Sequence, residues 1–159
     1  MNGYMNKKFS KKEIPKIAKA ILKKLTARPN GFIRAGKSKK QTACILAFSG
    51  DLGAGKTTLT QAIARELGVR EKIISPTFVI MKSYKLQTKS YKFLIHVDAY
   101  RLEKDAELLR LGWQEIISDP ENLVLIEWPE RVQKIIPETA ICINLSHEGD
   151  DTRCIEIEK

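Results

Sequence analysis

Residues 50–58 are Gly50-Asp51-Leu52-Gly53-Ala54-Gly55-Lys56-Thr57-Thr58, with the glycine, lysine and threonine spacing of a phosphate-binding loop. The apolar run 42–48 precedes the loop and is typical of a strand buried on both faces. Apolar residues recur at helical spacing over 59–67, and Gly68 is placed to end that helix. Strand, loop and helix in this order set a positive helix N-terminus against the ligand. This context makes a chance match of a glycine-rich turn a poor alternative.

Each residue type in this loop suits the binding of a nucleoside triphosphate. The glycines let backbone N–H groups approach phosphate oxygens without a side chain in the way. We expect Lys56 to reach the β- and γ-phosphates, Thr57 to ligate Mg²⁺ through its hydroxyl, and Thr58 to donate to the α-phosphate. The predicted nucleotide contacts are therefore Gly50, Asp51, Leu52, Gly53, Ala54, Gly55, Lys56, Thr57 and Thr58.

Length and composition predict one cytoplasmic domain over residues 1–159. A chain of 159 residues can bury a sufficient core without disulfides or metals, and it holds no apolar run of membrane-spanning length. The lysines near the N-terminus are not followed by the apolar stretch of a secretory signal. Cys44, Cys142 and Cys154 are odd in number and far apart, as expected of reduced, mostly buried thiols in a cytosolic protein.

The positive charge is concentrated in residues 1–40, which hold thirteen Lys/Arg and one acidic residue, whereas residues 41–159 hold fifteen and eighteen. This segment is compatible with an arm that faces RNA or an acidic partner, and equally with a solvated basic face. Within it, residues 10–27 carry an apolar stripe at helical spacing. We expect that stripe to pack on the domain rather than lie on a membrane. Residues 31–40 are expected to form a basic connector to the nucleotide-binding core, 41–159.

The remaining patterns predict an α/β fold with a mixed sheet flanked by helices, similar to P-loop NTPases. Residues 78–84 and 91–97 are strand-like and are predicted to form an antiparallel hairpin. A helix is expected over 103–111, ended by Gly112, with a further turn of helix at 113–117. Residues 123–126 form a buried strand, 131–135 a short helix, and 140–145 and 153–157 two alternating strands.

Three side chains outside the loop are candidates for metal binding and hydrolysis. Glu127 follows four apolar residues, so that a buried strand delivers a carboxylate that can hold Mg²⁺ through water or orient the attacking water. Asp98 also ends an apolar strand, and is a candidate second carboxylate near the metal. Thr77 lies where switch threonines sense the γ-phosphate, although β-branched strand entry explains it as well. The predicted catalytic residues are Lys56, Thr77, Asp98 and Glu127, and the predicted metal ligands are Thr57, Asp98 and Glu127.

The sequence leaves open the roles of several other residues and the class of protein to which the chain belongs. Trp128 suits either stacking beside the nucleotide or filling the core, and Arg101 suits a phosphate contact or an ion pair with Glu103 or Asp105. His96 and His147 lack a nearby nucleophile pattern and are interpreted as structural. A guanine-specificity motif and a transporter signature are missing. A nucleotide-gated RNA- or protein-binding module remains the alternative to an ATPase, and a small-molecule kinase has thin support.

Four motifs together resemble the TsaE (YjeE-type) ATPase family: residues 50–58, 75–78, 96–102 and 127–130. The resemblance spans residues 10–157 and implies a cytoplasmic Mg²⁺-ATPase, weak alone, that supports tRNA threonylcarbamoyladenosine synthesis beside the anticodon. It implies TsaD-like and TsaB-like partners, with hydrolysis resetting their complex, and no membrane or DNA contact. It also implies that Ser10 lies near the base and Trp128 beside the nucleotide. Pro15 and the long basic connector depart from the family pattern.

Overall fold

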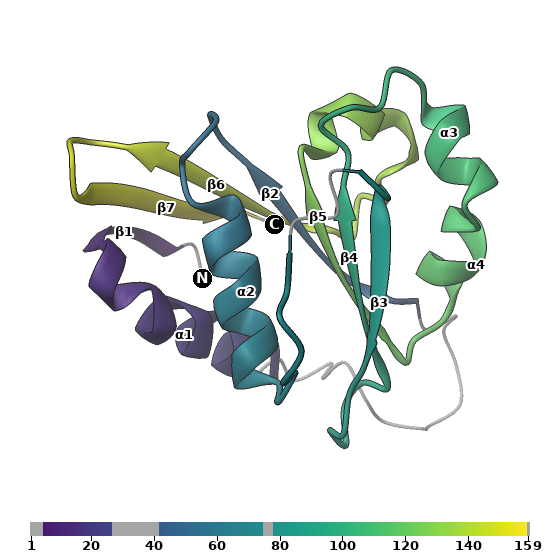
Figure 1. Ribbon diagram of the computed structural model, residues 1–159, viewed down its shortest axis with the longest axis horizontal. Helices are drawn as coiled ribbons and strands as arrows, with labels where there is room; N and C mark the ends of the chain where they lie inside the picture. The colour runs from purple at the N-terminus through teal and green to yellow at the C-terminus, as the bar shows by residue number, and fades with distance from the viewer. Residues whose placement is uncertain (1–4, 27–41, 75–77, 159) are drawn as a thin grey trace.

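The computed structural model describes residues 5–26, 42–74 and 78–158, and these form a seven-stranded mixed sheet flanked by helices (Figure 1). This confirms the predicted α/β fold. The strands are β1 (Met5–Ser10), β2 (Cys44–Ser49), β3 (Met81–Lys85), β4 (Phe93–Asp98), β5 (Asn122–Glu127), β6 (Ile141–His147) and β7 (Thr152–Glu158). The helices are α1 (Ile14–Thr26), α2 (Lys56–Glu66), α3 (Asp105–Arg110) and α4 (Trp113–Ser118), with 3-10 segments η1 (Lys11–Glu13) and η2 (Pro129–Ile135).

The strand order β1-β7-β6-β2-β5-β4-β3 places parallel strands in the centre and antiparallel strands towards the edges. Strands β6, β2, β5 and β4 run parallel, and the predicted hairpin is the antiparallel pair β3–β4. In this register Phe48 and Asp98 both pair with Glu127. Since carboxyl ends of parallel strands meet at one edge, the phosphate-binding loop and both predicted carboxylates come together there.

Hydrophobic clusters cover both faces of the sheet. One cluster includes Ile17 and Ile21 of α1 with Leu59 and Ile63 of α2, and the other includes Trp113 at the start of α4. Figure 1 shows the corresponding layers, with α1 and α2 on one side and α3 and α4 on the other. The stripe of α1 therefore packs on its own domain, as expected. Among the described residues, no helix has the length and hydropathy needed to cross a membrane.

The N-terminal region differs from the prediction in two ways. Residues 5–10 form strand β1, which pairs antiparallel with β7 and was not predicted. Only Phe9 of this edge strand is fully buried, so its polar sequence carries no clear alternation. The helix predicted from residue 10 begins as a 3-10 turn and becomes α-helical at Ile14. The connector at 31–40 lies outside the described residues.

The hairpin is also shorter at its start than predicted. Strand β3 begins at Met81, because Ile80 has a positive φ of 65° that interrupts the extended chain. The Ile80 carbonyl accepts a hydrogen bond from the Asp98 N–H at 2.8 Å. This unusual turn brings the chain that precedes β3 towards the carboxyl end of β4, beside the predicted site.

Candidate functional site

A cavity of about 320 Å³ lies where the loop before α2 meets the carboxyl ends of β4 and β5. It combines a cationic side chain, two carboxylates and two aromatic rings with the glycine-rich loop. It is lined by Leu52, Gly53, Gly55, Lys56, Thr57, Thr58, Asp98, Tyr100, Glu127 and Trp128. The structure thus brings most of the residues singled out in the sequence into one site.

The glycine-rich loop has a backbone course that side chains would obstruct. Gly50 has a φ of 132°, and a Cβ there would lie 2.1 Å from the carbonyl oxygen of Leu145 on β6. Gly55 has a φ of 104° and immediately precedes α2, which begins at Lys56. The free N–H groups of the first turn of α2 therefore lie at the cavity, an arrangement that favours an anion.

Lys56 is held within the loop rather than extended into solvent. Its Nζ donates hydrogen bonds to the carbonyl oxygens of Gly50 and Asp51, the latter at 2.9 Å. The same Nζ lies 3.8 Å from the centroid of the Trp128 ring. Burial lowers the pKa of Lys56 from its ordinary value, and nearby carboxylates, Glu127 foremost, oppose that effect. The ammonium group is poorly hydrated, which favours pairing with a bound anion.

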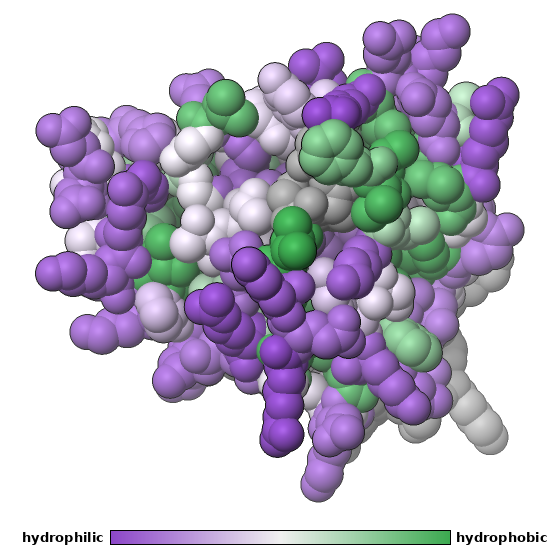
Figure 2. Space-filling view, in the orientation of Figure 1, coloured by the Kyte–Doolittle hydropathy of each residue, from purple (hydrophilic) through white to green (hydrophobic). Residues whose placement is uncertain are grey.

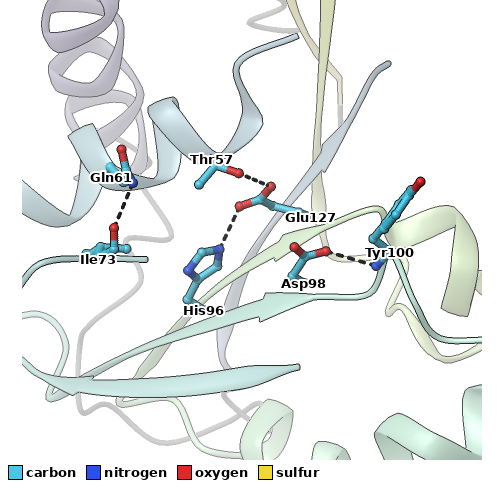
Figure 3. Close-up of polar contacts among 7 residues, drawn as sticks. All are labelled: Thr57, Gln61, Ile73, His96, Asp98, Tyr100 and Glu127. Atoms are coloured by element: carbon cyan, nitrogen blue, oxygen red, sulfur yellow. Dashed lines mark hydrogen bonds and ion pairs between the residues drawn. The ribbon is translucent and has the colours of Figure 1, made fainter. Parts of the chain in front are cut away.

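Glu127 joins three elements of secondary structure. Its Oε2 accepts a hydrogen bond from Thr57 Oγ1 of α2 at 2.8 Å, and its Oε1 lies 2.8 Å from His96 Nε2 of β4 (Figure 3). Glu127 and His96 are 2% and 0% exposed. The predicted metal ligand Thr57 is therefore already paired with the predicted carboxylate.

Asp98 lies beside Glu127 on the neighbouring strand. Its Oδ1 accepts a hydrogen bond from the Tyr100 N–H at 3.0 Å (Figure 3), and its side chain lines the cavity. Magnesium is usually held by one or two carboxylates, water and substrate phosphates rather than by a cage of protein ligands. Within the described ranges no cluster of three or more His, Cys, Asp or Glu residues could hold a metal. The hydroxyl of Thr57 and the two carboxylates fit the first kind of site.

Trp128 combines the two roles that the sequence left open. Its ring packs against the hydrophobic cluster beneath α3 and α4 and also lines the cavity. The backbone at Trp128 is left-handed, with a φ of 59°, and the ring centroid lies 5.0 Å from that of Tyr100. The two rings thus form one wall of the cavity next to Lys56.

The structure places two of the remaining candidates, Ser10 and Arg101, outside the cavity lining. Ser10 ends β1 and donates to Glu13 from its backbone N–H at 2.9 Å and from its hydroxyl at 3.2 Å; it does not line the cavity. Thr77 lies outside the described residues. The Arg101 guanidinium lies 4.6 Å from the Phe78 ring centroid. The alternative that the sequence left open for Arg101, an ion pair with Glu103 or Asp105, does not form among the described residues.

Sequence reasoning missed three residues next to the site. His96, for which the sequence predicts a structural role, contacts Glu127, and its position two residues before Asp98 on one strand is the signal that indicates this contact. Arg153 is 5% exposed, and its Nε lies 3.5 Å from where a Cβ of Gly55 would be. Tyr100 completes the aromatic wall. The contacts of His96 and Arg153 depend on strand pairing that no single motif records.

Comparisons with known proteins agree on one family. The family model for "Threonylcarbamoyl adenosine biosynthesis protein TsaE" matches residues 10–155, a range that contains the whole cavity lining. A Haemophilus influenzae protein, "tRNA threonylcarbamoyladenosine biosynthesis protein TsaE", is 36% identical over 121 residues, which cover 76% of this chain and 73% of that protein. A Bacillus subtilis protein of the same name is 37% identical over 109 residues, covering 69% of this chain and 65% of that protein.

A longer match and a solved structure extend this likeness to nearly the whole chain. A Rickettsia conorii protein with the same name is 32% identical over 149 residues, which cover 93% of this chain and 74% of that protein. The crystal structure of Bacillus subtilis YdiB superposes with a TM-score of 0.67 at 29% identity, covering 99% of this chain and 86% of that one.

Proposed function

The chain belongs to the TsaE family, and on that premise we propose that it is the Mg²⁺-dependent ATPase that supports tRNA threonylcarbamoyladenosine synthesis. Its TsaE relatives support a role in that biosynthesis. The observation that carries the proposal is that Lys56, Thr57 and Glu127 line the same cavity at the start of α2.

The cavity is suited to the polyphosphate of ATP. Its volume, about 320 Å³, lies at the lower end of the range for small-molecule sites. The N-terminus of α2 and the buried ammonium of Lys56 offer positive charge on the same side. Thr57, Asp98 and Glu127 would hold Mg²⁺, which supplies charge neutralisation at the phosphate oxygens when bound.

The protein's own residues would support hydrolysis in distinct ways. Lys56 would stabilise negative charge on the terminal phosphates, and Glu127 would orient the attacking water with its remaining lone pairs. Tyr100 and Trp128 would exclude bulk water from one side of the reacting group, which strengthens electrostatic interactions there. Thr77 stays a proposed switch residue, and Ser10 a proposed contact near the adenine.

The wider role follows from the family resemblance. We propose that the protein acts in the cytoplasm with TsaD-like and TsaB-like partners, and that hydrolysis drives turnover of their complex. Contact with tRNA would be indirect or through the basic segment 1–40. Leu52 and Phe78 are 77% and 86% exposed, and Figure 2 shows apolar residues at several places on a largely hydrophilic face, most of them on the right of the view. Exposed apolar residues of this kind support a protein contact.

Complementation tests this function in a bacterium depleted of its own TsaE-family protein, with the modified nucleoside in tRNA measured by mass spectrometry. The parent chain should restore threonylcarbamoyladenosine, and Lys56→Ala should not. Lys134→Ala is the matched control, since Lys134 is an exposed lysine on η2 that does not line the cavity. Full restoration by Lys56→Ala would refute a role for the nucleotide site.

A further inference from the structure

His96 is a buried titratable residue that contacts Glu127 but has no role in the hydrolysis proposed above. Its imidazole is fully buried on β4, and its Nε2 lies 2.8 Å from Glu127 Oε1 (Figure 3). Its other ring nitrogen, Nδ1, is buried without a hydrogen-bond partner. These contacts set both the position of the ring proton and the direction in which the hydrogen bond runs.

The unpaired Nδ1 indicates which ring nitrogen of His96 carries the proton. A buried N–H without an acceptor loses its hydration and gains nothing in return, so protonation at Nδ1 is disfavoured. A carboxylate has no proton of its own to donate. A proton on Nε2 satisfies both requirements, because that N–H donates to Glu127 Oε1.

Glu127 is consequently held at both oxygens by donors from different elements. Thr57 on α2 donates to Oε2 and His96 on β4 donates to Oε1. Because the carboxylate is 2% exposed, water is a poor substitute for a lost donor. His96 and Asp98 stand two residues apart on one face of β4, so His96 orients Glu127 while Asp98 lines the cavity.

We propose that His96 is a positioning residue for the ATPase reaction. It holds Glu127 in the orientation that accepts from Thr57 and turns its remaining lone pairs to the cavity. The expected effect on kcat rests on the proposed ATPase function. The contact between His96 and Glu127 does not depend on that function. Residues that hydrogen-bond to a metal ligand act in this way in other sites, and their mutation typically costs about 10–100-fold in metal affinity or activity.

The kinetic test compares His96→Leu, which removes the donor, with His96→Gln, whose side-chain amide can restore an N–H near the position of Nε2. His96→Leu should lower kcat about 10–100-fold. The KM for ATP should stay within a few-fold, since Lys56 and the loop are unchanged. His96→Gln should recover most of kcat. Ile95→Ala is the stability control, because Ile95 is a buried residue of β4 in the cluster on the other face. It should unfold more easily yet keep the parent kcat.

A second readout needs no hydrolysis. Nitrogen NMR of the nucleotide-free protein should show His96 protonated at Nε2 and bare at Nδ1. A ring protonated at Nδ1 alone, parent kcat in His96→Leu, or no recovery by His96→Gln would overturn the proposal. If the parent hydrolyses no ATP, the proposed function fails. The position of the ring proton then still shows whether His96 donates a hydrogen bond to Glu127.

Discussion

Replacing Gly50 with alanine should separate the construction of the phosphate-binding loop from general stability. The added Cβ would lie 2.1 Å from the Leu145 carbonyl oxygen, more than an ångström inside ordinary contact, and both groups are backbone-fixed. Gly68→Ala is the matched control: its φ is also positive, at 84°, but no atom lies within 4 Å of the new Cβ.

The two substitutions share a conformational cost and differ in the steric one. A positive φ costs a non-glycine residue about 1–3 kcal/mol, which is the whole effect expected for Gly68→Ala. Gly50→Ala must in addition displace the loop from β6, so its loss of unfolding free energy should exceed that of the control. A displacement of about 1 Å can cost about 100-fold in rate at a reacting site, so we expect ATP hydrolysis to slow by that order and ATP affinity to fall with it.

Guanidinium denaturation and ATP titration of the folded protein measure the two effects separately. Gly68→Ala should lose stability but bind ATP like the parent, whereas Gly50→Ala should lose both. If Gly50→Ala binds ATP within a few-fold of the parent, the loop does not depend on the close approach to Leu145. The reasoning from its geometry would then be refuted.

Three further changes test other parts of the structure. Thr57→Val removes the hydroxyl that donates to Glu127 and should lower ATP affinity about 10–100-fold in Mg²⁺ but little in EDTA; equal losses in both would contradict the metal role. Hydrogen bonds from Ser10 lower the pKa of Glu13, so the stability it adds is present above its ordinary pKa and lost as pH falls through the lowered value. The difference in unfolding free energy between the parent and Glu13→Gln should therefore shrink as the pH falls below the ordinary pKa of 4.5. A constant difference would argue against a contribution of the Ser10–Glu13 hydrogen bonds to stability. Trp113→Phe removes the indole N–H that donates to the Ile135 carbonyl at 3.0 Å and should cost about 1–3 kcal/mol by thermal or chemical unfolding. It also leaves Trp128 as the only tryptophan, whose fluorescence should change with ATP; an unchanged spectrum on saturation would place the nucleotide elsewhere.

Local chemistry explains which parts of the fold could be predicted from sequence. The glycine spacing before Lys56 and the continuous apolar run before Glu127 each specify a conformation within a few residues, and both were found where expected. Strand β1 was not predictable in this way. Its pairing with β7 joins residues about 150 positions apart, and its polar side chains carry no alternation.

The polar contacts of the site were harder to predict for the same reason. That Glu127 lies near Asp98 follows once both end parallel strands, but His96 reaches Glu127 only in the observed register and rotamers. The left-handed backbone at Trp128 is also set by tertiary packing, since no glycine or asparagine marks it. Motifs thus identified the loop and its carboxylates, and the structure added the residues that hold them.

Single-turnover ATP hydrolysis by the purified chain, with and without Mg²⁺, tests the central claim most directly. The parent should hydrolyse bound ATP only with Mg²⁺. Glu127→Gln should bind ATP within a few-fold of the parent but hydrolyse it at least about 100-fold more slowly. Hydrolysis by Glu127→Gln at the parent rate, or none by the parent, would contradict the claim that this cavity is the site of a Mg²⁺-dependent ATPase.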